Sequence, residues 1–520
     1  MSENRNIDAA RQYHSGTKHS YLSIRMHPHV LDWDNKPLLF KIYPTLEVTR
    51  LPRDFHETGK HALSAIAESG LAQRETIPDL ETLAQLLFFS AGVTRSKKHP
   101  EGETFFRAAA CTGALYEIEL YVVCCDLPGK GLKPDAQPAL PAGIYHFGAA
   151  EFGLRQLRAG DFRQVVVDAT AHDPSAAHAP VIIVCSGTYW RNAWKYHSRT
   201  YRHFGWDNGT ILANLLAMSS ALNLSAQIVT GFVDSEVNSL LGLDTKREVA
   251  FSLVSLGYSQ KPIPSSPKVD PLELPTVAYS AHEVDFPAMH KMHGASSFDS
   301  ATEISDWRRK TPSRDVTVAK GTVTTITPLD EPRVPKDTIE QVISRRGSTR
   351  QFSRDPITVQ QLSTILDSST RGIPADFLDP ESNHLNDLYL VINNVVGLAP
   401  GAYFYRWEQK QLELLKSGEF REKAGYLGLE QQIPADAAVD IFFLADLKKI
   451  LERYGNRGYR AVQLEAGILG GKFYIAAYAL KLGCSGLTFY DDDVVSFFSP
   501  HARGKSAIFL IALGRSALRK

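Results

Sequence analysis

The chain has 520 residues, 43% of them hydrophobic and 22% charged, which is an ordinary composition for a folded protein and a length that suits two domains. Lysine plus arginine and aspartate plus glutamate each total 57, so no net charge favours binding to nucleic acid or to an anionic membrane. The apolar runs are far shorter than the roughly 20 residues of a membrane-spanning helix, and the first residues do not resemble a secretory signal. We therefore expect a cytoplasmic protein with no nucleic-acid partner and no membrane partner.

The predicted elements come in the same order twice. Each half begins with an amphipathic helix, followed by an apolar run with strand character, a long alanine-rich helix and a closing strand that ends in glycine. This order predicts an α+β fold in each half. In the first half these elements are the helix with Leu83, Leu86 and Leu87, the strand 120–123, the helix at about 207–222 and the strand 251–257. In the second half they are the helix with Leu362, Ile365 and Leu366, the strand 388–391, the helix at about 465–481 and the strand 507–514.

Matching motifs show that the halves are copies of each other. Positions 145 and 403, 196 and 454, 221 and 479, and 234 and 492 lie in similar short motifs, and each pair is 258 residues apart. A constant spacing over such a length is hard to produce by chance. We predict a first domain over residues 1–261, a connector rich in Pro, Ser and Thr over 262–335, whose role is spacing, and a second domain over 336–520.

The five cysteines follow no metal-binding spacing, because none lies in a CxxC pair or a zinc pattern. They are typical of small buried side chains in a reducing compartment, and the sequence predicts no metal site. These residues are Cys111, Cys124, Cys125, Cys185 and Cys484.

Two motifs carry a family resemblance. The run RRGSTRQF at 345–352 resembles the RRSxRxF motif of the nitroreductase superfamily. The run RAAACTGALY at 107–116, followed by ELY at 119–121, is similar to the RxxPSxGALYPxExY segment of SagB-type dehydrogenases, which include azoline oxidases, and so is the start of the chain at 13–19. One departure stands out, because Ala110 and Cys111 replace the Pro-Ser of that segment. This removes a serine hydroxyl that contacts flavin in the family, and it leaves backbone amides and Thr112 for that contact.

The resemblance implies an FMN at the interface of two domains, so that the tandem domains form an intramolecular pseudo-dimer. The phosphate of FMN requires guanidinium groups and N–H donors, and Arg346, Ser348 and Arg350 match the motif that supplies them. Arg515, which follows the last strand, resembles the C-terminal arginine that also reaches the phosphate. The alternative for the arginine-rich run is a solvated cluster of charges.

The flavin ring would lie against the first-domain segment Cys111, Thr112 and Gly113, and against Gly486 and Leu487 on a strand of the second domain. Glycine at such a position permits close approach of the backbone, although a structural turn is the simpler alternative.

The two copies have lost complementary parts of the site. Aligning the early helices pairs Arg346 with Ala67 and Arg350 with Leu71, and Gly257 is followed by Tyr258 rather than by arginine. The second copy has no Gly-Ala-Leu-Tyr segment at 375–383. One complete site is therefore expected, and one FMN in each chain.

Lys195 and Tyr196 match the Lys-Tyr pair of the SagB-type oxidases, whereas the second copy has Arg453 before Tyr454. A lysine serves as a base when burial lowers its pKa, and arginine does not. We predict that Lys195 removes a substrate proton and that Tyr196 orients it. The alternative is an exposed lysine on a helix beside a packed tyrosine.

The resemblance therefore implies an FMN-dependent oxidoreductase that oxidises a heterocycle, azoline to azole, or a similar group in a peptide-derived substrate. Its partners would be a small or peptide-derived substrate and other enzymes of peptide modification, and further oligomerisation is compatible with the pseudo-dimer. Two alternatives stay open: an NAD(P)H-dependent reductase of nitro, quinone or enone compounds, and a non-catalytic partner of a modifying complex.

Overall fold

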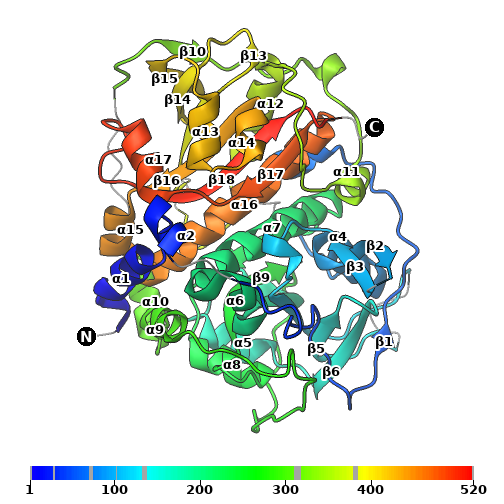
Figure 1. The fold of residues 1–520 in the computed structure, drawn as a ribbon. Helices are drawn as coiled ribbons and strands as arrows, with labels where there is room; N and C mark the ends of the chain where they lie inside the picture. The colour runs from blue at the N-terminus through cyan, green and yellow to red at the C-terminus, as the bar shows by residue number, and fades with distance from the viewer. Residues whose placement is uncertain are drawn as a thin grey trace.

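Two antiparallel sheets with the same strand order organise the chain. The computed structural model describes residues 3–26, 30–68, 74–100, 102–131, 137–309, 318–378 and 384–517. One seven-stranded sheet has the order β1-β6-β5-β4-β7-β9-β8, and the other has the order β10-β15-β14-β12-β16-β18-β17. Figure 1 shows the two sheets in separate halves, with the second half above the first. The predicted α+β duplication is confirmed.

The first half follows the predicted order of elements. Its edge strand β1 (Thr49–Arg50) comes from the N-terminal segment, after α1 (Asp8–Gly16) and α2 (Tyr21–Met26). The remaining elements are α3 (Ala62–Ala67), α4 (Leu80–Ala91), β2 (Val93–His99), β3 (Gly102–Arg107), β4 (Ile118–Cys124), β5 (Gly143–Gly148), β6 (Gly153–Ala159), α5 (Arg163–Ala169), β7 (Val181–Thr188), α6 (Tyr189–Tyr196), α7 (Thr200–Ala221), β8 (Ala226–Val229), α8 (Asp234–Leu241) and β9 (Glu248–Leu256).

The second half repeats this order with small differences. A short parallel pair, β11 (Ile357–Thr358) and β13 (Val395–Val396), is added beside the main sheet. The other elements are α11 (Ile339–Arg345), α12 (Val359–Thr370), β12 (Asp387–Ile392), β14 (Gly401–Arg406), β15 (Gln411–Ser417), α13 (Arg421–Leu427), α14 (Gln432–Asp436), β16 (Val439–Ala445), α15 (Leu447–Tyr454), α16 (Arg457–Ala479), β17 (Gly483–Leu487), α17 (Asp491–Phe498) and β18 (Ser506–Gly514).

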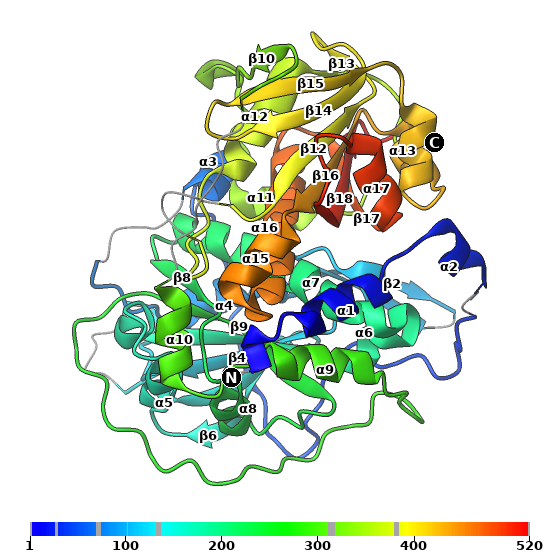
Figure 2. The same cartoon turned by 90° about the vertical axis from the view of Figure 1, so that its left-hand side faces the viewer.

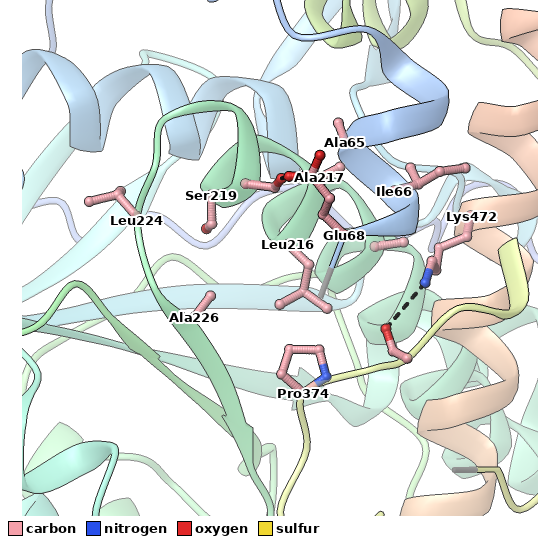
Figure 3. A pocket seen from close by; sticks show the side chains of 13 residues that line it. Ala65, Ile66, Glu68, Leu216, Ala217, Ser219, Leu224, Ala226, Pro374 and Lys472 are labelled. Carbon is pink, nitrogen blue, oxygen red and sulfur yellow. Dashed lines mark hydrogen bonds between the residues drawn. The ribbon is translucent and has the colours of Figure 1, made fainter. Parts of the chain in front are cut away.

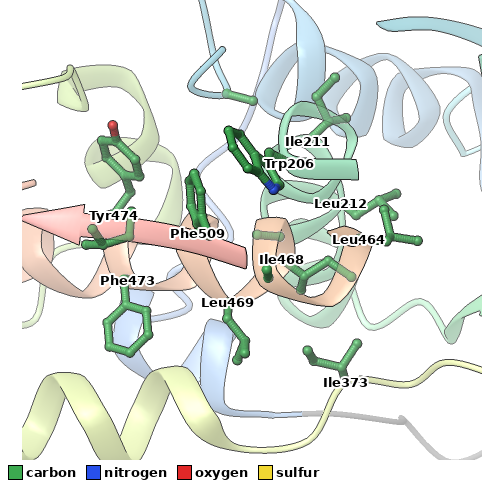
Figure 4. Packing of buried hydrophobic residues seen from close by; sticks show 14 of the residues in the cluster. Trp206, Ile211, Leu212, Ile373, Leu464, Ile468, Leu469, Phe473, Tyr474 and Phe509 are labelled. Carbon is green, nitrogen blue, oxygen red and sulfur yellow. The ribbon is translucent and has the colours of Figure 1, made fainter. Parts of the chain in front are cut away.

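The long helices α7 and α16 pack against each other and join the halves (Figures 1 and 2). Glycines make this close approach possible, because a Cβ added to Gly209 would lie 2.5 Å from the Cα of Gly467, and one added to Gly471 would lie 2.5 Å from the Cβ of Ala213. Figure 4 shows large side chains around this contact, with Trp206 beside Phe509 at a centroid distance of 5.0 Å. The core is therefore continuous across the two halves.

This packing predicts a large effect of one added methyl group. Gly209→Ala should lower the free energy of unfolding by roughly 1–3 kcal/mol, because the new Cβ meets backbone atoms that cannot move aside cheaply. Gly294→Ala is the matched control, since Gly294 also lies in a helix, α9 (Pro287–Ala295), and has no atom within 4 Å of its added Cβ. Urea unfolding of both variants measures the difference. Equal stability of the two variants would contradict the close helix contact.

Ion pairs of matching geometry clamp the halves together. Arg202 on α7 pairs with Asp491 of the second half at 2.7 Å, and Arg460 on α16 pairs with Asp234 of the first half at 2.6 Å. All four groups are buried. Both long helices consequently begin earlier than predicted, at Thr200 and Arg457, because the polar residues of their first turns are buried against these carboxylates. The second-half counterpart of Asp234 in this clamp is Asp491 rather than residue 492.

The segment predicted as a connector contains regular secondary structure in its described part. It contains α9, α10 (Ala301–Arg308) and β10 (Val323–Thr325), and β10 adds an edge strand to the second sheet. Met292 and Trp307 are fully buried in the core. The segment therefore does more than space the domains. Among the described residues, no helix is long and apolar enough to cross a membrane.

Candidate active site between the two halves

The loop between β3 and β4 is anchored to helix α7. Asp207 accepts hydrogen bonds from the backbone N–H of Thr112 at 2.9 and 3.0 Å and from its hydroxyl at 2.9 Å. In the second half, Glu465 lies 258 residues further on and accepts from the backbone N–H groups of Leu385 and Asn386. A carboxylate at this helix position thus holds the same part of each copy. Sequence reasoning missed Asp207, although the 258-residue spacing to Glu465 was a signal that could have found it.

Gly113 brings this loop close to the predicted catalytic tyrosine. Its φ is +64°, a left-handed conformation that favours glycine, and an added Cβ would lie 2.8 Å from the hydroxyl oxygen of Tyr196. Two of the predicted groups, the 111–113 segment and Tyr196, therefore meet. Burial and the nearby charge of Asp207 raise the pKa of Tyr196, which stays protonated at neutral pH.

Cys111 lies among buried acids. Its thiol is 3.4 Å from a carboxylate oxygen of Glu117 and 3.4 Å from one of Asp207, and it accepts the backbone N–H of Tyr116 at 3.0 Å. Burial and the two carboxylates raise the pKa of Cys111, and burial with the charge of Glu117 raises the pKa of Asp207. Cys111 is therefore a thiol at neutral pH. It is half-buried, as is Cys125, whereas the other three cysteines are buried as expected, and all five are free.

Lys195 lies in the last turn of α6 beside charges from both halves. Burial lowers its pKa, and the nearby cations Arg350 and Lys36 lower it further. Its ammonium nitrogen is 5.4 Å from the centre of the Tyr196 ring. Arg350 belongs to the second half and is exposed. The predicted base of one copy and a predicted phosphate ligand of the other are thus close enough to influence each other.

Arg346 crosses from the second half into the first. Its guanidinium donates to the backbone oxygens of Arg107 at 2.8 Å and Ala108 at 3.1 Å, directly before the 111–113 loop. In return, Arg95 of the first half donates to the backbone oxygen of Arg346 at 3.3 Å. Arg346 is buried, and burial lowers its pKa. This contact brings the two predicted half-sites together.

A tyrosine on α16 connects the remaining second-half residues. The hydroxyl of Tyr474 lies 3.0 Å from that of Ser348 and accepts the backbone N–H of Gly486 at 2.7 Å. Gly486 and Leu487 lie on β17, and Leu487 is buried. Arg515 is not drawn into this group, because it is exposed and its guanidinium donates to the backbone oxygen of Pro356 at 2.9 Å.

The pseudo-symmetric position has different chemistry. Glu68 follows the end of α3 as Arg346 follows the end of α11, so the structure pairs these two residues, one position away from the predicted pairing with Ala67. Leu71 lies outside the described residues. In Figure 3, Glu68, Leu216 and Lys472 line a small pocket, and Leu216 stands 258 residues before Tyr474. An acid and a leucine thus replace the arginine and the tyrosine of the first site.

Lys472 predicts a pH dependence of stability. It is buried, it donates to the backbone oxygen of Arg371 at 2.5 Å, and burial lowers its pKa from 10.5 to about 7. Between these values the unfolded chain binds the proton that the folded chain has lost, so the free energy of unfolding rises with pH by up to ~1.4 kcal/mol per pH unit. Urea unfolding of the parent and of Lys472→Met from pH 7 to 9 should give a difference that grows with pH. Parallel curves would contradict the lowered pKa.

The residues at the first site fit an FMN. Two guanidinium groups, Arg346 and Arg350, and the hydroxyl of Ser348 form a donor set that suits a phosphate dianion. A Cβ on Gly113, whose φ is left-handed, would lie 2.8 Å from the hydroxyl oxygen of Tyr196, and a Cβ on Gly486 of strand β17 would lie 3.1 Å from the ring of Phe509, so added side chains would crowd the backbone at both places. At the mirror position the described residue Glu68 stands in place of Arg346, and the counterpart of Arg350 lies outside the described residues.

Comparisons with known proteins match both halves of the chain. The model of the family described as "Nitroreductase family" matches residues 74–258 and 343–515. A protein and a crystal structure, both described as putative nitroreductases, are similar to the chain. The protein, from Methanocaldococcus jannaschii, is 25% identical over 172 residues, 31% of this chain and 85% of its own length. The structure, from Anabaena variabilis, has a TM-score of 0.75 at 24% identity and covers 98% of this chain and 99% of its own.

A third similarity is weaker. The structure of an Escherichia coli microcin synthetase complex with a truncated pro-microcin bound matches at 15% identity and a TM-score of 0.30, over 49% of this chain and 93% of that chain.

Proposed function

We propose, on the premise that this chain belongs to the nitroreductase family, that it is an oxidoreductase that holds one FMN between its two domains. The single observation that carries this proposal is the bond from Arg346 of the second domain to the backbone of Arg107 and Ala108 in the first, because it joins the two half-sites. The mirror position, with Glu68 where Arg346 would stand, repels a phosphate. The pseudo-dimer thus has one binding site of the two that its symmetry allows.

The residues have distinct roles in this proposal. Arg346, Arg350 and Ser348 hold the phosphate, and the backbone of the 111–113 loop and of Gly486 contacts the ring. When bound, FMN supplies the capacity to accept two electrons as a hydride. Lys195 removes the proton that leaves from the neighbouring atom of the substrate, which its lowered pKa favours. Tyr196, kept protonated by burial, orients the substrate through its hydroxyl.

The reaction we propose is the oxidation of a heterocycle, azoline to azole, or of a similar group in a peptide-derived substrate, with dioxygen as final acceptor. Its support is the resemblance of residues 107–121 to SagB-type dehydrogenases and a Lys-Tyr pair in the domain that carries the ring loop. Other enzymes of a peptide-modification pathway are the partners that this reaction requires, because the azoline must first be made. An NAD(P)H-dependent nitroreductase is the second candidate, and the similarity to the Methanocaldococcus protein favours it.

One experiment separates these reactions. Purified FMN-loaded protein is mixed, without dioxygen, either with NADPH or with a short thiazoline-containing peptide. The visible absorbance of the oxidised flavin is followed over time. We expect bleaching by the thiazoline peptide and loss of two hydrogens from it by mass spectrometry. Rapid bleaching by NADPH alone would support the reductase instead.

A further inference from the structure

A β-hairpin distinguishes the first copy from the second. Strands β2 and β3 form a separate two-stranded sheet between α4 and β4. The segment from α4 to β4 covers residues 92–117, whereas the corresponding segment from α12 to β12 covers only 371–386 and has no strand in its described part. The hairpin therefore belongs only to the copy that carries the 111–113 loop and Lys195.

The base of the hairpin lies at the site. Arg95 on β2 donates to the backbone oxygen of Arg346, and the hydroxyl of Tyr116 donates to the backbone oxygen of Phe105 on β3 at 3.0 Å. Strand β3 ends at Arg107, whose backbone oxygen binds Arg346. In Figure 1 the hairpin extends outward from this point, on the right of the first half. A chain lying along the hairpin would therefore lead to the site.

The hairpin carries positive charge on an exposed strand. Every residue of β2 from Arg95 to His99 is exposed, and this stretch includes Lys97 and Lys98. Among the described residues, neither lysine has an ion pair within 4.0 Å, although Lys98 stands opposite Glu103 in the ladder. Phe106 is 36% exposed and lies 5.3 Å from the guanidinium of Arg95, so an apolar surface accompanies the charge.

The β2 edge of the hairpin is open. Neither strand pairs with any other described strand, but on β3 the backbone oxygen of Phe105 and the backbone N–H of Arg107 are bonded to the hydroxyl of Tyr116, so it is β2 that offers backbone N–H and C=O groups without a ladder partner. Such an edge is a template for one more strand, and an extended peptide that adds there gains affinity from main-chain hydrogen bonds. Basic side chains beside the edge favour acidic side chains on the added strand.

We propose that the β2–β3 hairpin docks an extended acidic peptide segment as an added strand and so presents a peptide substrate to the site. This inference rests on the proposed function, because it names the class of peptide that the site receives. The main chain of the peptide pairs with the β2 edge of the hairpin, and the acidic side chains on one face of the peptide lie beside Lys97, which shares a face of the hairpin with Arg95 and Phe106. The alternate side chains of the peptide lie on the opposite face, which carries Lys98.

The test is the binding of labelled peptides to the full-length protein. The probe is a fluorescein-labelled peptide of twelve residues that alternates glutamate with valine or threonine, measured by fluorescence anisotropy at low salt. We expect saturable binding that Lys97→Glu with Lys98→Glu weakens about tenfold or more, and that weakens as salt is raised. The matched control is Lys448→Glu, an exposed lysine on α15, which should leave binding unchanged.

Two further probes test the strand geometry. N-methylation of every second residue of the peptide blocks main-chain hydrogen bonds while keeping the charges, so one of the two alternating patterns should abolish binding. Equal binding of both methylated peptides, or an oligodeoxythymidine of the same length competing as well as the peptide, would overturn the proposal in favour of a general polyanion surface. No binding at all would also overturn it. The binding assay does not depend on flavin or turnover. If the acidic peptide failed to bind but the thiazoline peptide were still oxidised, the docking proposal would fail and the proposed function would stand.

Discussion

Lys195→Ala should keep the fold and the flavin but lower substrate oxidation by roughly 10²–10⁴-fold, the usual contribution of a general base. The neutral amine is the active form, so turnover of the parent enzyme should rise with pH toward the pKa of Lys195, which burial and the charges of Arg350 and Lys36 hold below its ordinary value. In Lys195→Ala this rise should disappear. Steady-state kinetics between pH 6 and 9 at about equal flavin occupancy measure both effects.

The control is Arg453→Ala, at the same position of α15 in the second domain. On that side of the pseudo-dimer the described residue Glu68 stands in place of Arg346, so this change should leave turnover unaltered. Equal losses at Lys195 and Arg453, or full activity of Lys195→Ala, would remove the lysine from the mechanism. A reductase that needs no protein base would then be the better account.

Arg346→Ala should weaken FMN binding by roughly 1.5–3 kcal/mol, the scale of a charge-assisted hydrogen bond. The structure gives this change a second consequence, because the backbone oxygens of Arg107 and Ala108 lose their donor and the ring loop loses its link to the second domain. Flavin titration of the apoprotein measures the affinity. Arg350→Ala should weaken binding on the same scale and leave that link intact.

Glu68→Ala is the matched control, since Glu68 stands at the position equivalent to Arg346 in the first domain. It should leave flavin content unchanged. An Arg346→Ala protein that purifies with its full flavin content would mean that the phosphate is held elsewhere. The exposed Arg515, which donates to Pro356, would be the first residue to examine.

Much of the fold could be predicted because each copy repeats its own hydrophobic pattern. The 258-residue spacing of Tyr196 and Tyr454 reappears as two helices, α6 and α15, that end at these residues. The starts of α7 and α16 lie earlier than the apolar pattern predicts, because their first turns are polar and are buried here against a carboxylate of the other domain. Asp491 and Asp234 supply these carboxylates, and no local sequence pattern predicts the two ion pairs.

Sequence motifs predict the residues of the candidate site, but they do not predict the residues that hold them in place. Arg346 and Gly113 belong to recognisable runs, whereas Asp207 and Tyr474 lie within long buried helices whose composition does not set them apart. Their roles appear only when the fold brings Thr112 and Gly486 against them. Helices α9 and α10 were not predicted for a similar reason. The Pro and Ser content of the segment is typical of a connector, and only the fold shows that a few apolar residues, such as Trp307, anchor it in the core.

The central claim is that the two domains share a single flavin site. The most direct measurement is the ratio of FMN to protein, obtained by releasing the flavin from protein reconstituted with excess FMN and freed of unbound ligand. Arg346 and the 111–113 loop meet at one interface position, and Glu68 stands at the other, so the account predicts a ratio of about one FMN per chain at saturation. A ratio near two would contradict it, because the mirror position would then bind a phosphate without the arginine pair.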